Sequence, residues 1–303
     1  MSNEVVEPVE VRVGPERTVV DGVDVIGALS PSRAGDFMAC PLLYRFRTID
    51  KLPEPFAPEA VRGTLVHKVL EDLFDLPASE RTTDRASELL VPTWEAMLDA
   101  TPELAEMFTS DEGEEITTWL ASCRTALGRY FELEDPRRLE PAERELYVET
   151  VLESKLLLRG FVDRLDVAAG GEIRIVDYKT SRSPGEWFEA KALFQMKFYA
   201  LVLWRTRGVV PSMLKLIYLG NTETLSYEPD EAELLATERK VQALWEAIKL
   251  ASDTGDWRPS PGAICGWCAH QSLCPAWGGT PPPLPVVSAA EVCDPGLAAE
   301  DVD

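Results

Sequence analysis

Residues 160–179, GFVDRLDVAAGGEIRIVDYK, predict two β-strands joined by a tight turn. Apolar and β-branched residues fill both ends of the stretch, and the two glycines between them permit the positive φ angles that hairpin turns use. A three-residue loop centred on Gly170 makes residues whose numbers add up to 340 face each other, so Asp163 lies opposite Asp177. Because side chains alternate along a strand, Lys179 shares the face of Asp177. The sequence therefore predicts two carboxylates and an ammonium group on one patch.

Two facing carboxylates repel each other, which is unfavourable in a sheet that serves only the fold. A divalent cation such as Mg²⁺ relieves the repulsion, because it binds carboxylate oxygens, polarises a phosphate and lowers the pKa of a bound water. Lys179 could then orient that water or stabilise the developing negative charge. The alternative is an ordinary salt-bridge cluster on an exposed face. We favour the metal site, because apolar residues surround Asp163 in this register.

The charge of the chain is unevenly distributed. Its 303 residues include 30 basic and 52 acidic ones, a net charge of −22 that argues against a general polyanion-binding protein. Residues 151–220, however, contain 11 basic and 7 acidic residues. A locally positive region around the proposed site favours an anionic substrate.

The sequence carries no sign of membrane insertion or export. It has no apolar run of the about 18–20 residues that a membrane-spanning helix needs, and its acidic N-terminus lacks the pattern of a signal peptide. We therefore expect a cytoplasmic protein with reduced cysteines, whose close grouping indicates a metal site rather than disulfides.

The order of the predicted elements indicates an α/β fold in a single domain. Residues 1–28 are acidic and lack a clear period, so we expect a flexible acidic arm or an added edge strand. The domain spans residues 29–277, with a helical part over about 61–135 and a sheet core over about 143–250. Residues 278–303 are rich in proline and acidic residues, which is typical of a disordered tail.

Helices and strands alternate within this domain. A helix begins near Ser30 or Ser32 and breaks or restarts at Pro41, and two or three helices follow within residues 83–133. The first two strands of the core meet in a turn at residues 153–154. The expected strands cover residues 145–152, 155–167, 172–180, 213–219 and 222–227, and further helices cover 61–76, 187–204 and 230–250.

Two of these helices carry candidates for the site. His67 lies at the border of the apolar face of the helix over 61–76, where a lone histidine is more often a packing residue than a metal ligand. The helix over 187–204 carries a polar row at four-residue spacing, formed by Lys191, Gln195 and Tyr199. This row is either the boundary of an amphipathic helix or a surface that faces the cleft, with Gln195 and Tyr199 touching the substrate.

A group of cysteines near residues 260–277 has the spacing of a metal site. The sequence CGWCAHQSLC contains Cys265, Cys268 and Cys274, which need a fourth ligand. The candidates are Cys40, His270, Cys293 and Cys123. Cys123 lies on an apolar helical stripe and Cys293 in the tail, so Cys40 is the best of them. Four thiolates suit Zn²⁺ or an iron–sulfur cluster, and spacing alone does not choose between these; either would clamp the two ends of the fold together.

Together these motifs resemble the RecB-like exonuclease branch of the PD-(D/E)XK nuclease superfamily. More specifically, they resemble its iron–sulfur members, the AddB nuclease domain and the CRISPR-associated adaptation nucleases. The resemblance spans about residues 30–277. The matching segments are RGTLVHKVLE with His67, GFVDRLD with Asp163, VDYK with Asp177 and Lys179, QMKFY with Gln195 and Tyr199, and Cys40-Pro41 with the later cysteines.

The resemblance implies a mixed central sheet flanked by helices, with an N-terminal helical insertion and an iron–sulfur clamp. It implies a Mg²⁺ or Mn²⁺ site whose ligands are His67, Asp163, Asp177 and the carbonyl of Tyr178. The catalytic residues that it implies are Asp163, Asp177 and Lys179, and Gln195 and Tyr199 would line the DNA path. A 4Fe–4S cluster would be held by Cys40, Cys265, Cys268 and Cys274, with zinc as the less favoured occupant.

We therefore expect a Mg²⁺- or Mn²⁺-dependent deoxyribonuclease, an exonuclease that acts on single-stranded DNA ends in repair or processing. The acidity of the chain suggests that a protein partner such as a helicase delivers the DNA. The alternative is a non-catalytic DNA-binding or assembly subunit that keeps the fold and the cluster. The presence of His67, Asp163, Asp177 and Lys179 together favours the enzyme.

Overall fold

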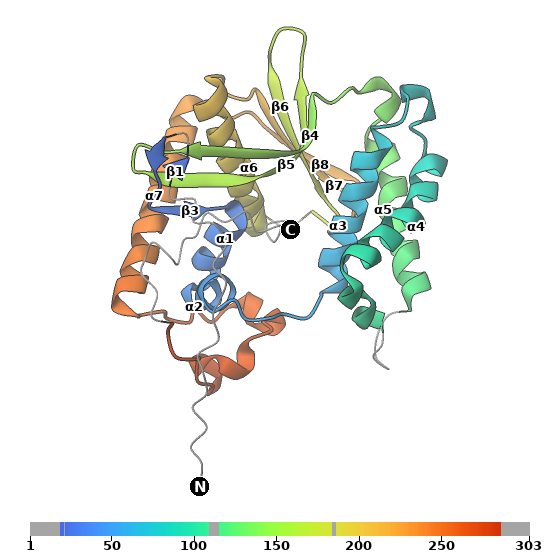
Figure 1. Ribbon diagram of the computed structural model, residues 1–303. Coiled ribbons are helices and arrows are strands. Elements are labelled where there is room, and N and C mark those ends of the chain that lie inside the picture. Colours follow the sequence, from blue (N-terminus) through green and yellow to red (C-terminus); the bar gives the residue numbers. More distant parts are fainter. Residues whose placement is uncertain (1–18, 21, 109–114, 184–185, 286–303) are drawn as a thin grey trace.

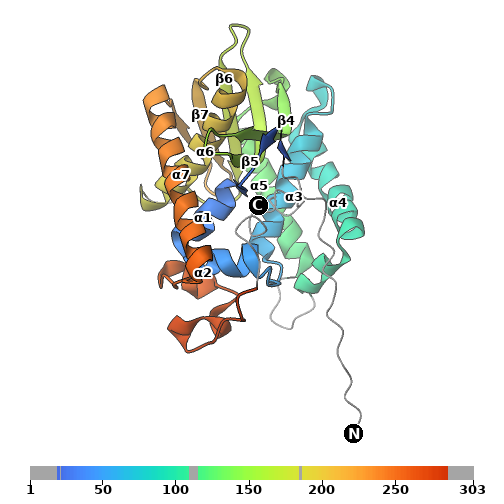
Figure 2. The same ribbon diagram turned by 60° about the vertical axis from the view of Figure 1, so that its left-hand side comes forward.

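The fold is a mixed central sheet with helices on both of its faces (Figures 1 and 2). The computed structural model describes residues 19, 20, 22–108, 115–183 and 186–285. Within this part of the chain, helices α3, α4 and α5 cover one face, and α1, α6 and α7 cover the other. The cysteine-rich segment lies beside α2 in both views, below the sheet.

In the described part of the chain, six strands form the sheet, in the order β3-β5-β6-β7-β8, with β4 paired to β5 outside this path. The strands are β3 (Gly27–Leu29), β4 (Glu143–Val151), β5 (Leu156–Val167), β6 (Ile173–Lys179), β7 (Met213–Tyr218) and β8 (Glu223–Tyr227). β3 runs parallel to β5 and β6 parallel to β7, whereas the other pairs are antiparallel. This arrangement agrees with the predicted α/β class.

The predicted register of the central hairpin is confirmed. Arg164 pairs with Val176 and Val167 pairs with Ile173, so each pair adds up to the expected 340. The loop is closed by a hydrogen bond of 2.9 Å from the Ala168 N–H to the Glu172 carbonyl. Gly171 has a φ of 93°, which glycine adopts without steric cost.

One edge of β5 is shared between two partners, and this division creates the site. β3 pairs with residues 156–158 of β5, and β6 pairs with residues 164–167. Asp163 therefore lies just beyond the last paired residues, where β5 and β6 separate. Backbone groups and side chains at such a separation can hydrogen-bond to something other than the ladder.

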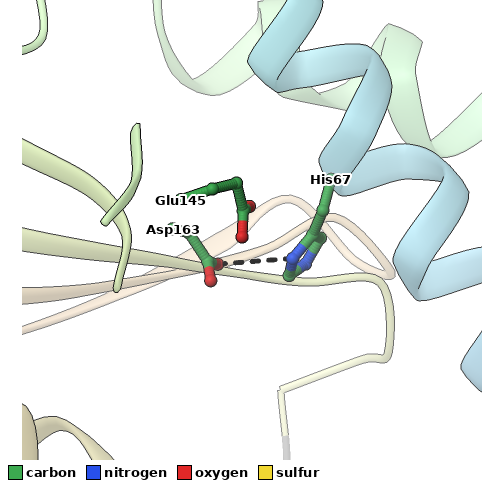
Figure 3. Close-up of side chains that lie close together, drawn as sticks. All are labelled: His67, Glu145 and Asp163. Atoms are coloured by element: carbon green, nitrogen blue, oxygen red, sulfur yellow. Dashed lines mark ion pairs between the residues drawn. The ribbon is translucent and has the colours of Figure 1, made fainter. Parts of the chain in front are cut away.

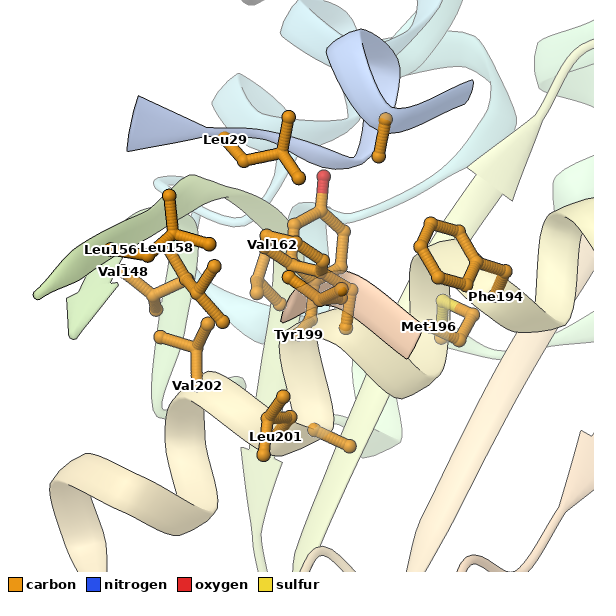
Figure 4. Packing of buried hydrophobic residues seen from close by; sticks show 14 of the residues in the cluster. Leu29, Val148, Leu156, Leu158, Val162, Phe194, Met196, Tyr199, Leu201 and Val202 are labelled. Atoms are coloured by element: carbon orange, nitrogen blue, oxygen red, sulfur yellow. The ribbon is translucent and has the colours of Figure 1, made fainter. Parts of the chain in front are cut away.

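Among the described residues, two hydrophobic clusters hold the helices on the sheet. On one face, α3 (Pro58–Leu73), α4 (Thr83–Ala100) and α5 (Ile116–Leu133) pack against Val176 and Ile217 of the sheet. Cys123 is fully buried in this cluster, as expected of a core thiol. On the other face, α1 (Pro31–Ala39), α6 (Glu186–Arg207) and α7 (Glu231–Thr254) share a cluster with Leu158 and Val162 (Figure 4).

The predicted start of the first helix near Ser30 and its restart at Pro41 are confirmed. The hydroxyl of Ser30 caps α1 by accepting the Arg33 N–H at 3.3 Å. The chain leaves the helix at Cys40 and restarts as α2 (Pro41–Tyr44), because proline tolerates only the first turn of a helix. A π-helical turn, Arg45–Ile49, follows directly.

Of the two expectations for residues 1–28, a flexible arm or an added edge strand, the described part of this segment supports the edge strand. Val19–Val20 and Val23–Asp24 form a small two-stranded sheet, β1 and β2, and Gly27–Leu29 is the edge strand β3. Residues 1–18, and residues 286–303 of the predicted tail with Cys293, lie outside the described part. None of the described helices combines the length and the apolar character that a membrane crossing requires.

Candidate active site

Side chains from one helix and two strands meet where β5 and β6 separate (Figure 3). His67 comes from α3, Glu145 from β4 and Asp163 from β5. One ligand atom from each of the three lies within 4.8 Å of those of the other two. Of the residues that the structure describes, these three form the group of histidine, cysteine and acidic side chains that could hold a metal ion.

His67 lies over the end of β6, although it is distant from it in sequence. Its Nε2 donates a hydrogen bond of 2.8 Å to the carbonyl of Tyr178, and its Nδ1 lies 3.6 Å from Oδ2 of Asp163. The neighbouring Val66 and Leu70 are buried and fix the position of α3 on the sheet. The imidazole is thus placed between a carboxylate and a backbone carbonyl.

Asp163 takes over a hydrogen bond that the ladder no longer supplies. Its Oδ2 accepts the backbone N–H of Tyr178 at 2.7 Å. The peptide groups of Tyr178 are therefore held by two side chains of the site, with the N–H on Asp163 and the carbonyl on His67. The ring of Tyr178 is buried on the face that α3, α4 and α5 cover, where its hydroxyl accepts a hydrogen bond of 2.5 Å from Arg164.

Asp177 and Lys179 lie on one face of β6, as predicted. Oδ2 of Asp177 is 3.1 Å from Nζ of Lys179, which also donates to Oε1 of Gln195 at 3.0 Å. Burial of Asp177, whose relative exposure is 2%, raises its pKa from 3.8 to about 6, and the nearby negative charge of Asp163 adds to the increase. Lys179 and His67 act in the opposite direction. The site thus holds a carboxylate whose ionisation is costly.

Glu145 is the residue that the sequence analysis missed. The neighbouring pairs Arg144–Arg164 and Leu146–Val162 place it opposite Asp163. Its φ of 43° is unusual for a residue other than glycine and is typical of strain at functional sites. Burial and the charge of Asp163 raise its pKa from 4.5 to about 7.

The two residues of the predicted DNA path differ in their surroundings. Gln195 lines a groove beside Lys179, and its contact with DNA stays a prediction. Tyr199 has a relative exposure of 7% and packs against Gly160, where an added Cβ would lie 2.7 Å from the tyrosine ring. The amide of Gln195 donates to the Tyr199 hydroxyl at 3.4 Å. The nearly buried side chain of Tyr199 thus supports Gln195 from behind, and its contact with DNA stays a prediction.

The donor set suits a divalent cation. Carboxylate and carbonyl oxygens are the ligands that Mg²⁺ and Mn²⁺ prefer, and an imidazole nitrogen is compatible with Mn²⁺. The site offers carboxylates from Asp163, Glu145 and Asp177, the imidazole of His67 and the carbonyl of Tyr178. Two of these carboxylates have raised pKa values that a cation would lower.

The four predicted cysteine ligands line one cavity below α2. Cys40, Cys265, Cys268 and Cys274 all contribute to its wall. Backbone N–H groups point at two of the sulfurs, from Ser260 to Cys40 at 3.3 Å and from Gly262 to Cys265 at 3.4 Å. Among the described residues, no three cysteine sulfurs lie within 4.8 Å of one another.

Two of the alternative fourth ligands have other roles in the described part of the chain. Cys123 lies in the helical core. His270 is buried, and its Nε2 lies 2.7 Å from Oε1 of Glu54. Glu54 also binds Arg47 through both carboxylate oxygens at 2.8 Å, and Arg47 reaches Asp36 at 2.8 Å. This chain of ion pairs joins the cysteine-rich segment to α1.

Comparison with known proteins places this geometry in a family. Residues 28–275 match the profile of the PD-(D/E)XK nuclease superfamily. The chain belongs to the PD-(D/E)XK nuclease superfamily. Nucleases of this superfamily use divalent metals and cleave DNA, so the match assigns the chain a nuclease fold of the hydrolase class and agrees with the carboxylate and histidine site.

Relatives of this superfamily member occur in bacteriophages. The chain is 24% identical to the gene 69 protein of Mycobacterium phage L5 over 287 residues, which cover 82% of this chain and 96% of the relative. It is 27% identical to the gene 69 protein of Mycobacterium phage D29 over 203 residues, which cover 59% of this chain and 70% of the relative. A solved structure of a candidate exonuclease from Eubacterium rectale has the same fold, with a TM-score of 0.54 and 12% sequence identity. The match covers 81% of this chain and 88% of that structure.

Proposed function

We propose that this PD-(D/E)XK protein is a metal-dependent DNA exonuclease of the RecB-like type that acts on single-stranded ends. The observation that carries the proposal is the group of His67, Glu145 and Asp163 where β5 and β6 separate, together with the Asp177–Lys179 ion pair on β6. A salt-bridge cluster on an exposed face would not bury Asp177 beside a second carboxylate.

The chemistry that we propose is phosphodiester hydrolysis. A Mg²⁺ or Mn²⁺ ion held by His67, Asp163, Asp177 and the Tyr178 carbonyl would polarise the scissile phosphate and lower the pKa of a bound water. Lys179 has its ammonium group between Asp177 and Gln195, with a quarter of its side chain exposed toward the groove. From there it can orient the nucleophile and stabilise charge on the phosphate oxygens.

Glu145 is a further member of this proposed site. Its carboxylate faces Asp163 across the two strands, on the side of His67 (Figure 3). An ionised Glu145 adds a negative charge next to Asp163 that a bound cation would offset, and its strained backbone is costly without such a role. We infer that it contributes to metal binding or orients the attacking water.

For the four thiols lining one cavity we propose a 4Fe–4S cluster. In a tetrahedral zinc site with Zn–S bonds of about 2.3 Å, the sulfurs are about 3.8 Å apart. The wider spacing of the cysteines favours a larger group. The N–H groups directed at Cys40 and Cys265 are suited to thiolates. A bound cluster would tie α2 to the C-terminal segment of the domain.

The biological setting that we propose is DNA repair or processing together with a protein partner. The net charge of −22 opposes the long-range attraction of DNA, although residues 151–220 carry an excess of basic residues. A partner such as a helicase would supply a single-stranded end directly to the site.

The test is a cleavage assay on end-labelled single- and double-stranded DNA with Mg²⁺ or Mn²⁺. The wild-type protein should shorten single strands from an end and leave circular single strands intact. Asp163→Asn and Lys179→Ala should each abolish cleavage, whereas Lys249→Ala, which removes a lysine paired with Glu246 on α7, should not. A wild-type protein that binds DNA but never cuts it would support the alternative, a non-catalytic subunit.

A further inference from the structure

A groove opens beside the candidate active site, between α1 and the first half of α6. It is lined by Pro31, Ser32, Gly35 and Asp36 on one side, and by Lys179, Ser181, Arg182, Lys191 and Gln195 on the other. Its empty space is about 1170 Å³, part of which is open to solvent. Because Lys179 and Gln195 belong to its wall, whatever lies in the groove reaches the catalytic lysine.

Four cationic side chains line the groove, and they differ in their ion pairs. Lys179 lies against Asp177, and Arg47 is held by Asp36 and Glu54. Arg182 and Lys191 are exposed and form no ion pair with any side chain that the structure describes. The charges of these two residues are therefore available to a ligand.

The backbone that carries Arg182 is fixed by a close contact with the β7–β8 turn. The Gly220 N–H donates to the Ser181 carbonyl at 3.0 Å, and the Ser183 N–H donates to Oδ1 of Asn221 at 2.9 Å. A Cβ on Gly220 would lie 2.3 Å from the Ser181 carbonyl carbon. Only glycine permits this approach, so the loop is held beside the groove.

Lys191 is placed by a second glycine. Its Cε lies 3.4 Å from the position that a Cβ on Gly35 would take, so its aliphatic chain crosses the surface of α1 at a point without a side chain. The ammonium group is carried into the groove, one helical turn before Gln195. Arg182 and Lys191 therefore flank the approach to Lys179.

We propose that this groove holds the sugar–phosphate backbone of one nucleic-acid strand next to the scissile bond, with Arg182 and Lys191 each contacting a phosphate. The inference rests on the proposed nuclease function and adds the path of the strand. Phosphate contacts of this kind position a strand without reading its sequence. They also explain how a chain with a net charge of −22 can retain a polyanion at its active site.

The test is the salt dependence of binding to a fluorescein-labelled single-stranded oligonucleotide, measured by anisotropy in EDTA. A phosphate contact to a single strand contributes about 0.7 to the slope of log K against log salt, which is about fivefold in affinity at 0.1 M salt. Arg182→Ala and Lys191→Ala should each bind about fivefold more weakly, with a slope that is smaller by about 0.7. The decrease in slope should be about twice as large in the double variant. The matched control is again Lys249→Ala, which should bind like the wild type.

Cleavage kinetics separate this proposal from the proposed function. In Mg²⁺ or Mn²⁺ the two variants should raise KM with kcat unchanged, because binding is lost and the reacting groups are intact. Cleavage by the wild type with unaltered KM and salt slope in both variants would overturn the groove assignment and leave the nuclease standing. A wild-type protein that neither binds nor cuts DNA would overturn both.

Discussion

The pKa of Asp177 makes its replacement a sharp test of the site. The carboxyl group is buried beside Asp163, and its pKa in the folded protein is about 6, compared with 3.8 as its ordinary value. Asparagine has almost the same shape and carries no charge. Asp177→Asn should therefore stabilise the metal-free protein while abolishing cleavage.

The magnitude follows from the two pKa values. Each pKa unit corresponds to about 1.4 kcal/mol, so ionised Asp177 destabilises the folded state by about 3 kcal/mol. Because the pKa is raised in the folded state, protonated Asp177 carries no such cost, and the protein has its full stability below pH 3.8. This contribution to the free energy of unfolding is lost as the pH rises through about 6. The pKa of about 6 already includes the attraction of Lys179, so we expect a net gain of about 3 kcal/mol for Asp177→Asn above pH 7.

The assay is urea unfolding in EDTA at constant ionic strength between pH 4 and pH 8. The free energies of unfolding of wild type and variant should converge at the acidic end and separate as the pH rises. Mg²⁺ should then stabilise the wild type and leave Asp177→Asn unchanged, because the ligand set is incomplete. Asp253→Asn, on the exposed end of α7, is the control and should follow the wild type. If the plots of unfolding free energy against pH ran parallel for the wild type and Asp177→Asn, the reasoning would be refuted.

Three further substitutions test other parts of the account. Glu145→Gln should weaken Mn²⁺ binding about tenfold in calorimetry, and an unchanged affinity would exclude this residue from the site. Gly160→Ala should lower the free energy of unfolding by about 1–3 kcal/mol, measured by chemical denaturation, because the new methyl meets Tyr199; a neutral effect would show that the ring can move aside. Cys268→Ser should reduce the iron bound per chain after anaerobic purification and should raise KM more than it lowers kcat; zinc in place of iron in the wild type would contradict the cluster.

The central hairpin could be predicted because the sequence of its loop restricts the turn type and therefore the pairing register. The glycines of the AAGG loop fit a three-residue connection, and apolar residues on both sides fix which face is buried. Asp163, Asp177 and Lys179 follow from that register; in the structure Asp177 pairs with Lys179, and Asp163 accepts the neighbouring Tyr178 N–H. The cap at Ser30 and the restart at Pro41 were equally local signals.

Glu145 could not be found in this way, because the turn before β5 differs from the prediction. A two-residue turn at 153–154 would place Arg144 opposite Asp163. The chain instead forms a three-residue loop, closed by the Leu152 N–H and the Leu156 carbonyl at 2.9 Å, with Lys155 at a φ of 64°. A lysine in this conformation leaves no signal in the sequence, and the shift of one residue exchanges the side chains that face the site.

Tyr199 illustrates the limit of helical spacing. Residues four apart share a face of a helix, but the spacing does not say where along that face the groove ends. The ring lies in the core because Gly160 has no side chain, and that packing depends on a strand distant in sequence. The contact between the cysteine-rich segment and Arg47 could not be predicted for the same reason. Glu54 and His270 are far apart in sequence and meet only in the folded chain.

Titration with Mn²⁺ by isothermal calorimetry tests the central claim most directly. The wild-type chain should bind Mn²⁺ at the site formed by His67, Asp163 and Asp177, and His67→Ala and Asp163→Asn should each weaken that binding at least tenfold. Equal stoichiometry and affinity in wild type and both variants would contradict a metal centre at this position.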